Sequence, residues 1–479
     1  MKVTRRRALF HQRRTTNVYR LFVLALLIMA GAWLIIRLTS HEIANPFSPT
    51  PTSTRMIDSW VQEGEASFNA GDLPAAITAY QEALSVDPNN AEIQAELARI
   101  QAYSSRLLSN DSDRLVRLTE ALQSADQAKT LAPEDSNVLA FRAFVLDWNA
   151  DPNLDDLRTD GRTAARLLIE ADQEALHAIS LNSKNPLALA FYAEILIDQQ
   201  KWTQAEPNIL SALKLDSSGM DVHRVYGYYL ESIRFYRQAI EEYQQALIAN
   251  PNLTFLYISI GHNYRTLALS LPPGSQQTEL YSQALASYAK AVRLNEQLKI
   301  LDPSPYLAIA KTYAQEGQFF AAALNAQKAV ELDPTNADLY GQLGNIYKRG
   351  RNFETAIIAL QCAVDGCTAV ESCLARNGCP QGDPGVDVPP LQLSPRSATY
   401  YLDYGSVLAA FSPQKPSNCD AAVRVLTLLI QTYPADQIIV RNASDGLSIC
   451  TNVIAAQTQT PSPVTQPAIT PTPVYTPSP

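Results

Sequence analysis

The chain has 479 residues, of which 46% are hydrophobic and 18% are charged, a composition typical of a folded protein. Its formal net charge is −9, and because residues 1–20 hold seven basic and no acidic side chains, the remainder carries −16. This acidic balance excludes binding to nucleic acid through a general basic surface, so we expect no nucleic-acid partner.

The N-terminal residues predict a membrane anchor. Residues 1–18 form a basic tail, expected in the cytoplasm, and residues 19–39 hold an apolar run of about the 20 residues that a membrane-spanning helix needs. By the positive-inside rule the rest of the chain lies outside the cytoplasm of a single-pass protein. A cleaved signal peptide is the alternative, because Ala30-Gly31-Ala32 resembles a cleavage site, and the protein would then be secreted. Residues 40–56, rich in Pro, Ser and Thr, predict an extended linker.

From residue 57 onward the sequence repeats at a 34-residue period wherever nothing has been inserted. Each copy places small residues and an aromatic or aliphatic residue one helical turn apart, followed by a proline. The clearest copies are Ala76, Tyr80, Ala83 and Pro88; Ala239, Tyr243, Ala246 and Pro251; and Ala322, Ala326, Ala329 and Pro334. Such a period is the mark of an all-α solenoid, in which each helix pair buries its apolar face against its neighbours.

These positions resemble the tetratricopeptide repeat (TPR) family. In the first copy its pattern is matched by Trp60, Gly64, Ala76, Tyr80, Ala83 and Pro88. The resemblance implies a membrane-anchored, bacterial-type TPR protein. It also implies a right-handed superhelical solenoid of about nine helix-turn-helix repeats, with repeats 1–8 over residues 57–363. A final repeat and a C-terminal helix are expected over residues 396–456, and residues 457–479 form a Thr/Pro-rich tail without an apolar pattern, expected to be disordered.

Three stretches lengthen the interval between copies: Tyr103–Arg114, Asn149–Arg162 and Leu271–Thr278. Insertions in solenoids map to loops at one edge of the array, and loop length costs little entropy. We therefore expect these stretches to be surface loops.

Six cysteines occur late in the chain: Cys362, Cys367, Cys373, Cys379, Cys419 and Cys450. The first four lie in or next to residues 364–395, a Gly- and Pro-rich insertion that breaks the repeat and buries too little apolar surface to be stable alone. Disulfides are predicted, with Cys373–Cys379 and Cys419–Cys450 as the expected pairs, although six cysteines allow 15 pairings. A zinc site and a reactive thiol are the alternatives, but the spacing lacks a two-residue separation and no histidine lies nearby.

No catalytic, cofactor-binding or metal-binding motif is recognisable, so we expect no enzyme and no cofactor. His223 and His262 fall on first helices of successive repeats, where we expect partly exposed histidines. Acidic pairs such as Glu241-Glu242 are expected to face solvent.

The family resemblance implies that first helices line a groove holding a protein or peptide partner. The groove-facing residues that it implies are Asp58, Val61, Glu65, Phe68, Glu194, Asp198, Asp221, Arg224, Tyr228, Glu231, His262, Arg265, Lys311, Asn345, Lys348 and Arg349. The groove residues are mainly acidic in the early repeats and mainly basic in the later ones. Such a gradient would fix the direction of a bound segment. The alternative is that these charges are only solvated. The expected function is a membrane-tethered, extracytoplasmic scaffold for protein–protein interaction. The alternatives are an accessory subunit of an envelope enzyme and a self-associating structural envelope protein.

Overall fold

A computed structural model describes residues 17–39 and 56–458, which fall into two units that divide after Met56. Most of the predicted basic tail, linker and Thr/Pro-rich tail lies outside the described residues. The first unit holds one helix, α1 (Val18–Thr39). No helix in residues 17–39 or 56–458 combines the length and the apolar character that crossing a membrane requires. The membrane span predicted for residues 19–39 is therefore not supported.

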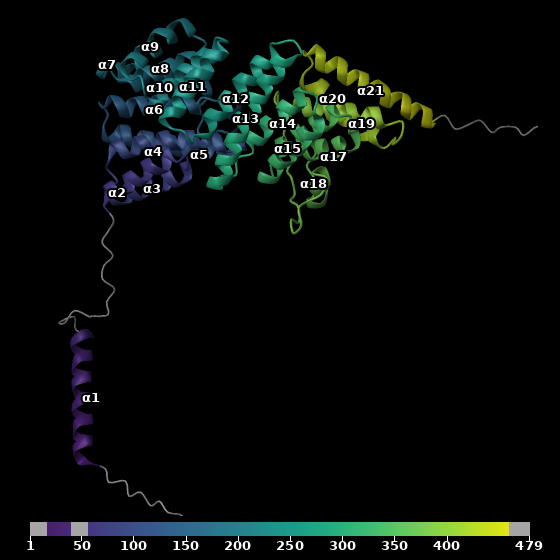
Figure 1. Ribbon diagram of the computed structural model, residues 1–479. Helices are drawn as coiled ribbons and strands as arrows, with labels where there is room; N and C mark the ends of the chain where they lie inside the picture. The colour runs from purple at the N-terminus through teal and green to yellow at the C-terminus, as the bar shows by residue number, and fades with distance from the viewer. Residues whose placement is uncertain (1–16, 40–55, 459–479) are drawn as a thin grey trace, which may run out of the picture. The chain divides into compact units, whose positions relative to one another are not determined.

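The second unit is an array of helix hairpins, numbered 1 to 9 in chain order (Figure 1). The pairs are α2 (Ile57–Asn69) with α3 (Leu73–Val86), α4 (Ala91–Ser104) with α5 (Asp111–Leu131), α6 (Ser136–Asn149) with α7 (Ala164–Leu181), α8 (Pro186–Asp198) with α9 (Trp202–Leu215), α10 (Met220–Ser232) with α11 (Tyr236–Ala249), α12 (Thr254–Leu269) with α13 (Ser275–Leu298), α14 (Ser304–Gln315) with α15 (Phe319–Leu332), α16 (Ala337–Arg349) with α17 (Phe353–Val364), and α19 (Ala398–Phe411) with α20 (Asn418–Thr432). A short helix, α18 (Ala369–Ala375), precedes α19, and α21 (Gln437–Thr458) follows α20. The predicted all-helical repeat architecture is confirmed.

Polar residues begin several of the first helices. Asn90, Asp135, Asn185 and Asn336 each precede one, and their side chains accept hydrogen bonds from backbone N–H groups of the first turn. These groups have no partner within the helix, so each cap stabilises its helix by roughly 1 kcal/mol. The turn between two hairpins therefore ends the second helix of one hairpin and caps the first helix of the next.

Within hairpins, a glycine of the first helix faces a tyrosine ring of the second. A Cβ atom built on Gly227 would lie 2.9 Å from the ring of Tyr243, and one on Gly64 would lie 2.6 Å from the ring of Tyr80. Both tyrosines are buried. The glycines therefore allow the two backbones to approach closely around an aromatic side chain.

We expect Gly227→Ala to destabilise the protein by about 1–3 kcal/mol, because the added methyl overlaps a buried ring. At an exposed helical site the same change would stabilise by roughly 0.5–1 kcal/mol, so the sign of the effect is informative. Urea denaturation measures it. The exposed neighbour Gln244→Ala on α11 is the control, with a change within about 0.5 kcal/mol. A more stable Gly227→Ala variant would contradict the tight packing.

The hydrophobic core has two large parts. One runs from α2 to α12 and the other from α14 to α21, with two small clusters around α12 and α13 between them. Both large parts are made mainly of the alanine, leucine and tyrosine positions of the repeat.

The first turn of the array closes on itself. The Asn250 side chain donates to the Asn69 side chain at 2.6 Å, which joins hairpin 5 to hairpin 1. Arg99 on α4 forms an ion pair with Asp221 on α10 at 2.9 Å. Hairpins 1 and 2 therefore pack against hairpins 5 and 6 as well as against their neighbours in sequence.

The insertion after α4 contributes a second closing contact. The Asn336 side chain donates to the Ser109 carbonyl at 3.2 Å, and Arg396 forms an ion pair with Asp111 at 2.7 Å. Ser105 and Leu107, in a short 3-10 helix of the same insertion, are buried. The expectation of a surface loop is wrong here, because the insertion fills the space between distant hairpins.

The insertion between α6 and α7 is also partly buried. It forms a 3-10 helix over Pro152–Leu157, and Leu154 is fully buried. Asp155 accepts a hydrogen bond from the backbone of Ala164 at 2.8 Å, which ties the insertion to the start of α7. By contrast, Pro272 to Gln276 are exposed, as expected of a surface loop.

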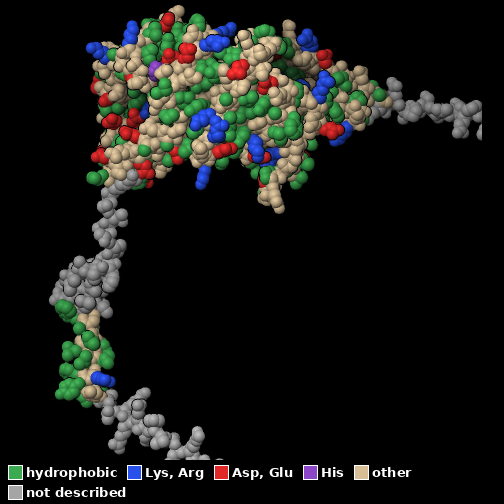
Figure 2. Space-filling model, in the orientation of Figure 1, with side chains coloured by type: hydrophobic (Ala, Val, Ile, Leu, Met, Phe, Trp, Pro, Cys, Tyr) green, Lys and Arg blue, Asp and Glu red, His purple; other side chains and the backbone are tan. Residues whose placement is uncertain are grey.

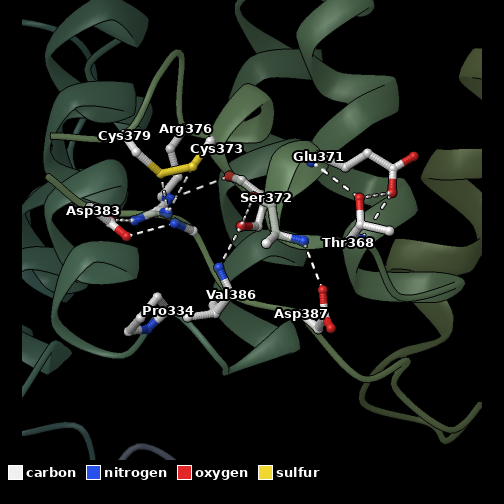
Figure 3. The surroundings of a disulfide bond; sticks show 12 residues. Pro334, Thr368, Glu371, Ser372, Cys373, Arg376, Cys379, Asp383, Val386 and Asp387 are labelled. Atoms are coloured by element: carbon white, nitrogen blue, oxygen red, sulfur yellow. Dashed lines mark hydrogen bonds and ion pairs between the residues drawn. A yellow bond between two sulfur atoms is a disulfide. The ribbon is translucent and has the colours of Figure 1, made fainter. Parts of the chain in front are cut away.

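The irregular segment after α17 is held by disulfides. The structure pairs Cys362 with Cys367, Cys373 with Cys379, and Cys419 with Cys450, with Cα–Cα distances of 4.6, 4.8 and 5.3 Å. Figure 3 shows the Cys373–Cys379 bridge beside the buried guanidinium of Arg376, which forms an ion pair with Asp383 at 3.0 Å. Hydrogen bonding to the Gly385 backbone and the nearby Arg376 hold the pKa of Asp383 below its usual value. Disulfide bonds and an ion pair thus stabilise a short segment that buries little apolar surface.

Candidate binding cavity

A cavity of about 900 Å³ lies among the first helices of hairpins 3 to 6. Residues of α6, α8, α10 and α12 form much of its wall, and Ser105, Arg106, Ala150, Asp151 and Pro152 from the two insertions complete it. Its size falls within the range of pockets that hold small organic ligands. The insertions predicted to be surface loops therefore help to build a hollow that could hold a ligand.

One wall of the cavity is a buried ion pair. The Arg224 guanidinium donates to both carboxylate oxygens of Glu194, at 2.7 and 2.6 Å, and both residues are buried. Trp148 donates its indole N–H to Glu194 at 3.1 Å, and the Arg224 guanidinium lies 5.7 Å from the centre of the Trp148 ring. Burial opposes the charge of Arg224, but its interactions with Glu194 and Asp221 together outweigh this effect and raise the pKa of Arg224. The charges of this pair cancel each other.

A second wall holds two carboxyl groups that no cation pairs. Asp147, on α6, is 4% exposed, and neither of its carboxylate oxygens accepts a hydrogen bond from any described group. Asp198, on α8, is exposed and accepts a hydrogen bond from the Tyr228 hydroxyl at 2.6 Å. Burial, together with the charge of Asp198, raises the pKa of Asp147 well above its usual value. Although part of the Asp198 side chain reaches solvent, the loss of hydration on its side facing the cavity raises its pKa to about 6.

Tyr103 contacts residues that line this cavity and residues that line a second hollow. Its hydroxyl donates to the Asp221 carboxylate and accepts from Arg224 at 3.1 Å, and its ring stacks on Phe255 with 5.2 Å between centroids. Arg224 and Phe255 line the first cavity, and Asp221 lines the second hollow, of about 550 Å³. The contacts that close the array therefore also link the linings of the two hollows.

Six of the sixteen residues of the predicted groove lie together in the structure. Those that line the 900 Å³ cavity are Glu194, Asp198, Arg224, Tyr228, Glu231 and His262. Asp58 and Glu65, with Val61, Phe68 and Asp221, line the 550 Å³ hollow. The acidic first half of the predicted groove thus faces two interior spaces rather than one continuous channel.

The later, basic residues lie elsewhere. Asn345 donates to Asp403 of α19 at 2.7 Å, and Lys348 forms an ion pair with the same carboxylate. Arg349 donates to the Ala314 carbonyl at 2.9 Å. Arg265 contacts His262 at 3.1 Å. Partial loss of hydration, together with the charge of Arg265, lowers the pKa of Lys311.

On the face in Figure 2, acidic side chains gather at the end of the array that carries α2, and basic side chains lie nearer its middle. Because Asp403 neutralises Lys348, the charge at the basic end of the groove is weaker than the sequence implies.

His223 is buried, not partly exposed. Its ring lies 2.7 Å from the Glu242 carboxylate and 3.0 Å from the Ser217 carbonyl, so Glu242 is also not a purely solvated residue. The hydrogen bond to Glu242, against the opposing effect of burial, raises the pKa of His223.

We expect this pair to stabilise the fold mainly at acidic pH. Because the folded pKa of His223 is raised, its contribution is complete below the unfolded value of about 6.5 and is lost as the pH rises through the folded pKa. The urea midpoint of Glu242→Gln should fall further below wild type at pH 6 than at pH 9. The neighbouring Glu241→Gln is the control, and equal differences at both pH values would contradict this role for the pair.

The sequence did not single out Asp147, Trp148 or Arg106. Asp147 and Trp148 directly precede one insertion, and Arg106 lies inside another. This position beside the insertions is the only feature of the sequence that could have indicated a role in a site. Their spacing in the sequence could not show that the insertions of hairpins 2 and 3 face the same space.

Two family models match short parts of the array. The model described as TPR repeat matches residues 64–102, and the one described as tetratricopeptide repeat matches residues 325–358. These two segments are therefore similar to tetratricopeptide repeats. The matched residues cover parts of hairpins 1 and 2 and the junction of hairpins 7 and 8, where the repeat frame is clearest.

No curated protein matches this chain in sequence. Among solved structures, a monomeric mutant of IFIT1 with m7Gppp-AAAA has a TM-score of 0.51 and 15% identity, covering 90% of this chain and 86% of that one. Human IFIT1 dimer with PPP-AAAA gives 0.49 and 16%, covering 84% of each chain. A tetratricopeptide repeat protein from Parabacteroides merdae gives 0.34 and 16%, covering 62% of this chain and 99% of that one. At such low identity the first of these likenesses concerns the fold alone.

Proposed function

We propose that the TPR array is a non-catalytic scaffold that binds a protein or peptide partner outside the cytoplasm. The observation that carries the proposal is the convergence of polar side chains from the first helices of hairpins 1 to 6 on interior hollows. Side chains from several repeats can contact one extended segment at once, which is how solenoids bind partners.

The compartment is proposed from the cysteines. Three disulfides persist most readily in an oxidising environment, such as a periplasm or an extracellular space. The proposed binding of a partner by the helical array does not require a membrane tether. Alkaline washing of membranes tests residues 19–39: retention of the protein in the membrane fraction would favour a tether, and release would favour the cleaved-signal alternative.

The IFIT1 mutant was solved with m7Gppp-AAAA, but the chemistry of this array favours a different partner. The chain outside residues 1–20 is strongly acidic, and the cavity lining contains more carboxylates than guanidinium groups. RNA phosphates would be repelled by such a surface. Protein partners therefore remain the better proposal.

Site-specific cross-linking in intact cells tests the scaffold. A photo-reactive residue in place of Asp58, at the exposed inner side of α2, should capture a different protein, identified by mass spectrometry. The same residue in place of Gln245, exposed on the second helix α11, is the control. A captured enzyme would favour the accessory role, and a second copy of the chain would favour self-association. Equal capture at both positions would contradict an inner binding surface.

A further inference from the structure

The 900 Å³ cavity holds a buried carboxyl group, Asp147, that receives no hydrogen bond from a described donor and interacts with the carboxyl group of Asp198. Neither oxygen of Asp147 accepts a hydrogen bond from a described group, although the residue is 4% exposed. Buried polar groups are nearly always hydrogen-bonded, because leaving one unpaired costs roughly 1–3 kcal/mol. Asp147 lines the cavity, and its neighbour Asp198 is the exposed member of the pair.

The other carboxylates of the lining already have partners. Glu194 is held by Arg224, and Asp151 forms an ion pair with Arg114 at 3.1 Å. Glu231 accepts hydrogen bonds from Tyr243 at 3.0 Å and from Asn263 at 2.7 Å. Among these carboxyl groups Asp147 is therefore the buried one whose oxygens lack a donor, and Asp198 lies beside it.

Arg106 does not neutralise this pair. Its guanidinium lies 5.0 Å from the centre of the Trp148 ring, and no described carboxylate lies within ion-pair distance of it. Burial and the charges of Arg114 and Arg224 lower the pKa of Arg106. Beyond ion-pair distance, the positive charge of Arg106 still lowers the pKa of Asp198, against the larger effect of burial. Two close carboxyl groups in such a site must share a proton or gain a cation.

The size and the walls of the cavity favour an organic cation over a metal ion. Leu168, Phe255, Leu256 and Ile258 supply apolar surface, and the volume far exceeds that of a bare ion. The described residues hold no group of three or more side chains suited to a metal.

We propose that the cavity binds an organic ammonium ion, whose charged nitrogen lies at Asp198 and Asp147 and whose carbon chain packs against Leu168, Phe255 and Ile258. The ligand is either a free amine or a lysine side chain of a peptide. This site goes beyond the proposed scaffold and does not rest on it, because a free amine would bind whether or not a protein partner exists.

Binding should release protons. The pKa of Asp198 is raised to about 6 and that of Asp147 is raised well above its usual value, so the empty cavity takes up protons as the pH falls toward 5.5. The bound cation stabilises both groups in the ionised form. Affinity should therefore fall as the pH is lowered from 7.5 to 5.5.

Titration calorimetry on the full chain in 0.15 M salt tests the site with two probes, spermidine and a capped lysine tripeptide. We expect at least one to bind at pH 7.5 with proton release, seen as a heat that depends on the buffer, and to bind about 10-fold more weakly at pH 5.5. Spermidine binding would identify a free amine, and binding of the tripeptide alone would identify a peptide source. The neutral diol 1,8-octanediol should not bind.

Two variants locate the charge. Asp147→Asn and Asp198→Asn should each weaken binding of the active probe by about 10-fold or more, which is about 1.4 kcal/mol. Asp151→Asn removes an equal charge from the same cavity at a residue that Arg114 already pairs, and should change affinity by less than about 3-fold. Thermal unfolding checks that each variant is folded. The proposal is overturned if neither probe binds, or if Asp151→Asn weakens binding as much as the other two.

Discussion

Replacing Tyr103 by alanine should lower the free energy of unfolding by about 3–5 kcal/mol, the range for truncating a large aromatic residue in a core. Tyr103 is fully buried and its ring contacts Phe255, Phe144 and Trp148. The substitution would leave a cavity where hairpin 2 packs against hairpin 6. Chemical denaturation followed by circular dichroism measures the loss.

The matched control is Phe320→Ala, since this aromatic side chain is 80% exposed and its loss should cost less than about 0.5 kcal/mol. Tyr103→Phe separates the ring from the hydroxyl: it keeps the packing but removes a hydrogen-bond partner from Asp221 and Arg224. That change should cost about 1–3 kcal/mol, the penalty for leaving a buried polar group unsatisfied. If Tyr103→Ala were as mild as Phe320→Ala, the first turn of the array would not be closed through this residue.

Removing the disulfide between Cys419 and Cys450 should have the second large effect. The bridge ties α20 to α21 and closes a loop with a sequence separation of 31. The loop-entropy relation gives a loss of about 3–4 kcal/mol for the double serine variant. Because solenoid repeats unfold in part from their ends, we expect the loss to appear first as faster hydrogen exchange in α21.

The bridge between Cys362 and Cys367 is the comparison, because its separation is only 5 and the same relation gives about 2 kcal/mol. A double serine variant there should leave exchange in α21 unchanged. Equal effects of the two variants on α21 would show that the terminal helix is held by packing and not by its disulfide.

The repeat frame predicted the helical hairpins because its information is local. Gly227 and Tyr243 lie on consecutive helices, and their spacing alone indicates that two backbones approach around one ring. The expected pairs Cys373–Cys379 and Cys419–Cys450 are both present in the structure. The membrane span is different: residues 21–36 are apolar in sequence, but no described helix meets the requirement for a span.

The candidate cavity could be predicted only in part. Glu194, Asp198 and Arg224 follow from the phase of the repeat, and they do lie together. Asp147 could not be singled out, since an acidic residue near the end of a helix is ordinarily solvated. Its burial depends on the residues packed around the end of α6, which no spacing within one repeat reveals.

The sequence by itself determined the hairpin unit, its caps, its small and aromatic contact positions and the cysteine-rich interruption, because each depends on residues within about one repeat. The tertiary structure alone decided that Tyr103 meets Asp221 across 118 residues and that Asn336 reaches Ser109 across 227. These contacts depend on the small rotation between successive repeats, summed over several of them. The total rotation over several repeats brings distant hairpins into contact, and no single repeat contains the information that predicts it.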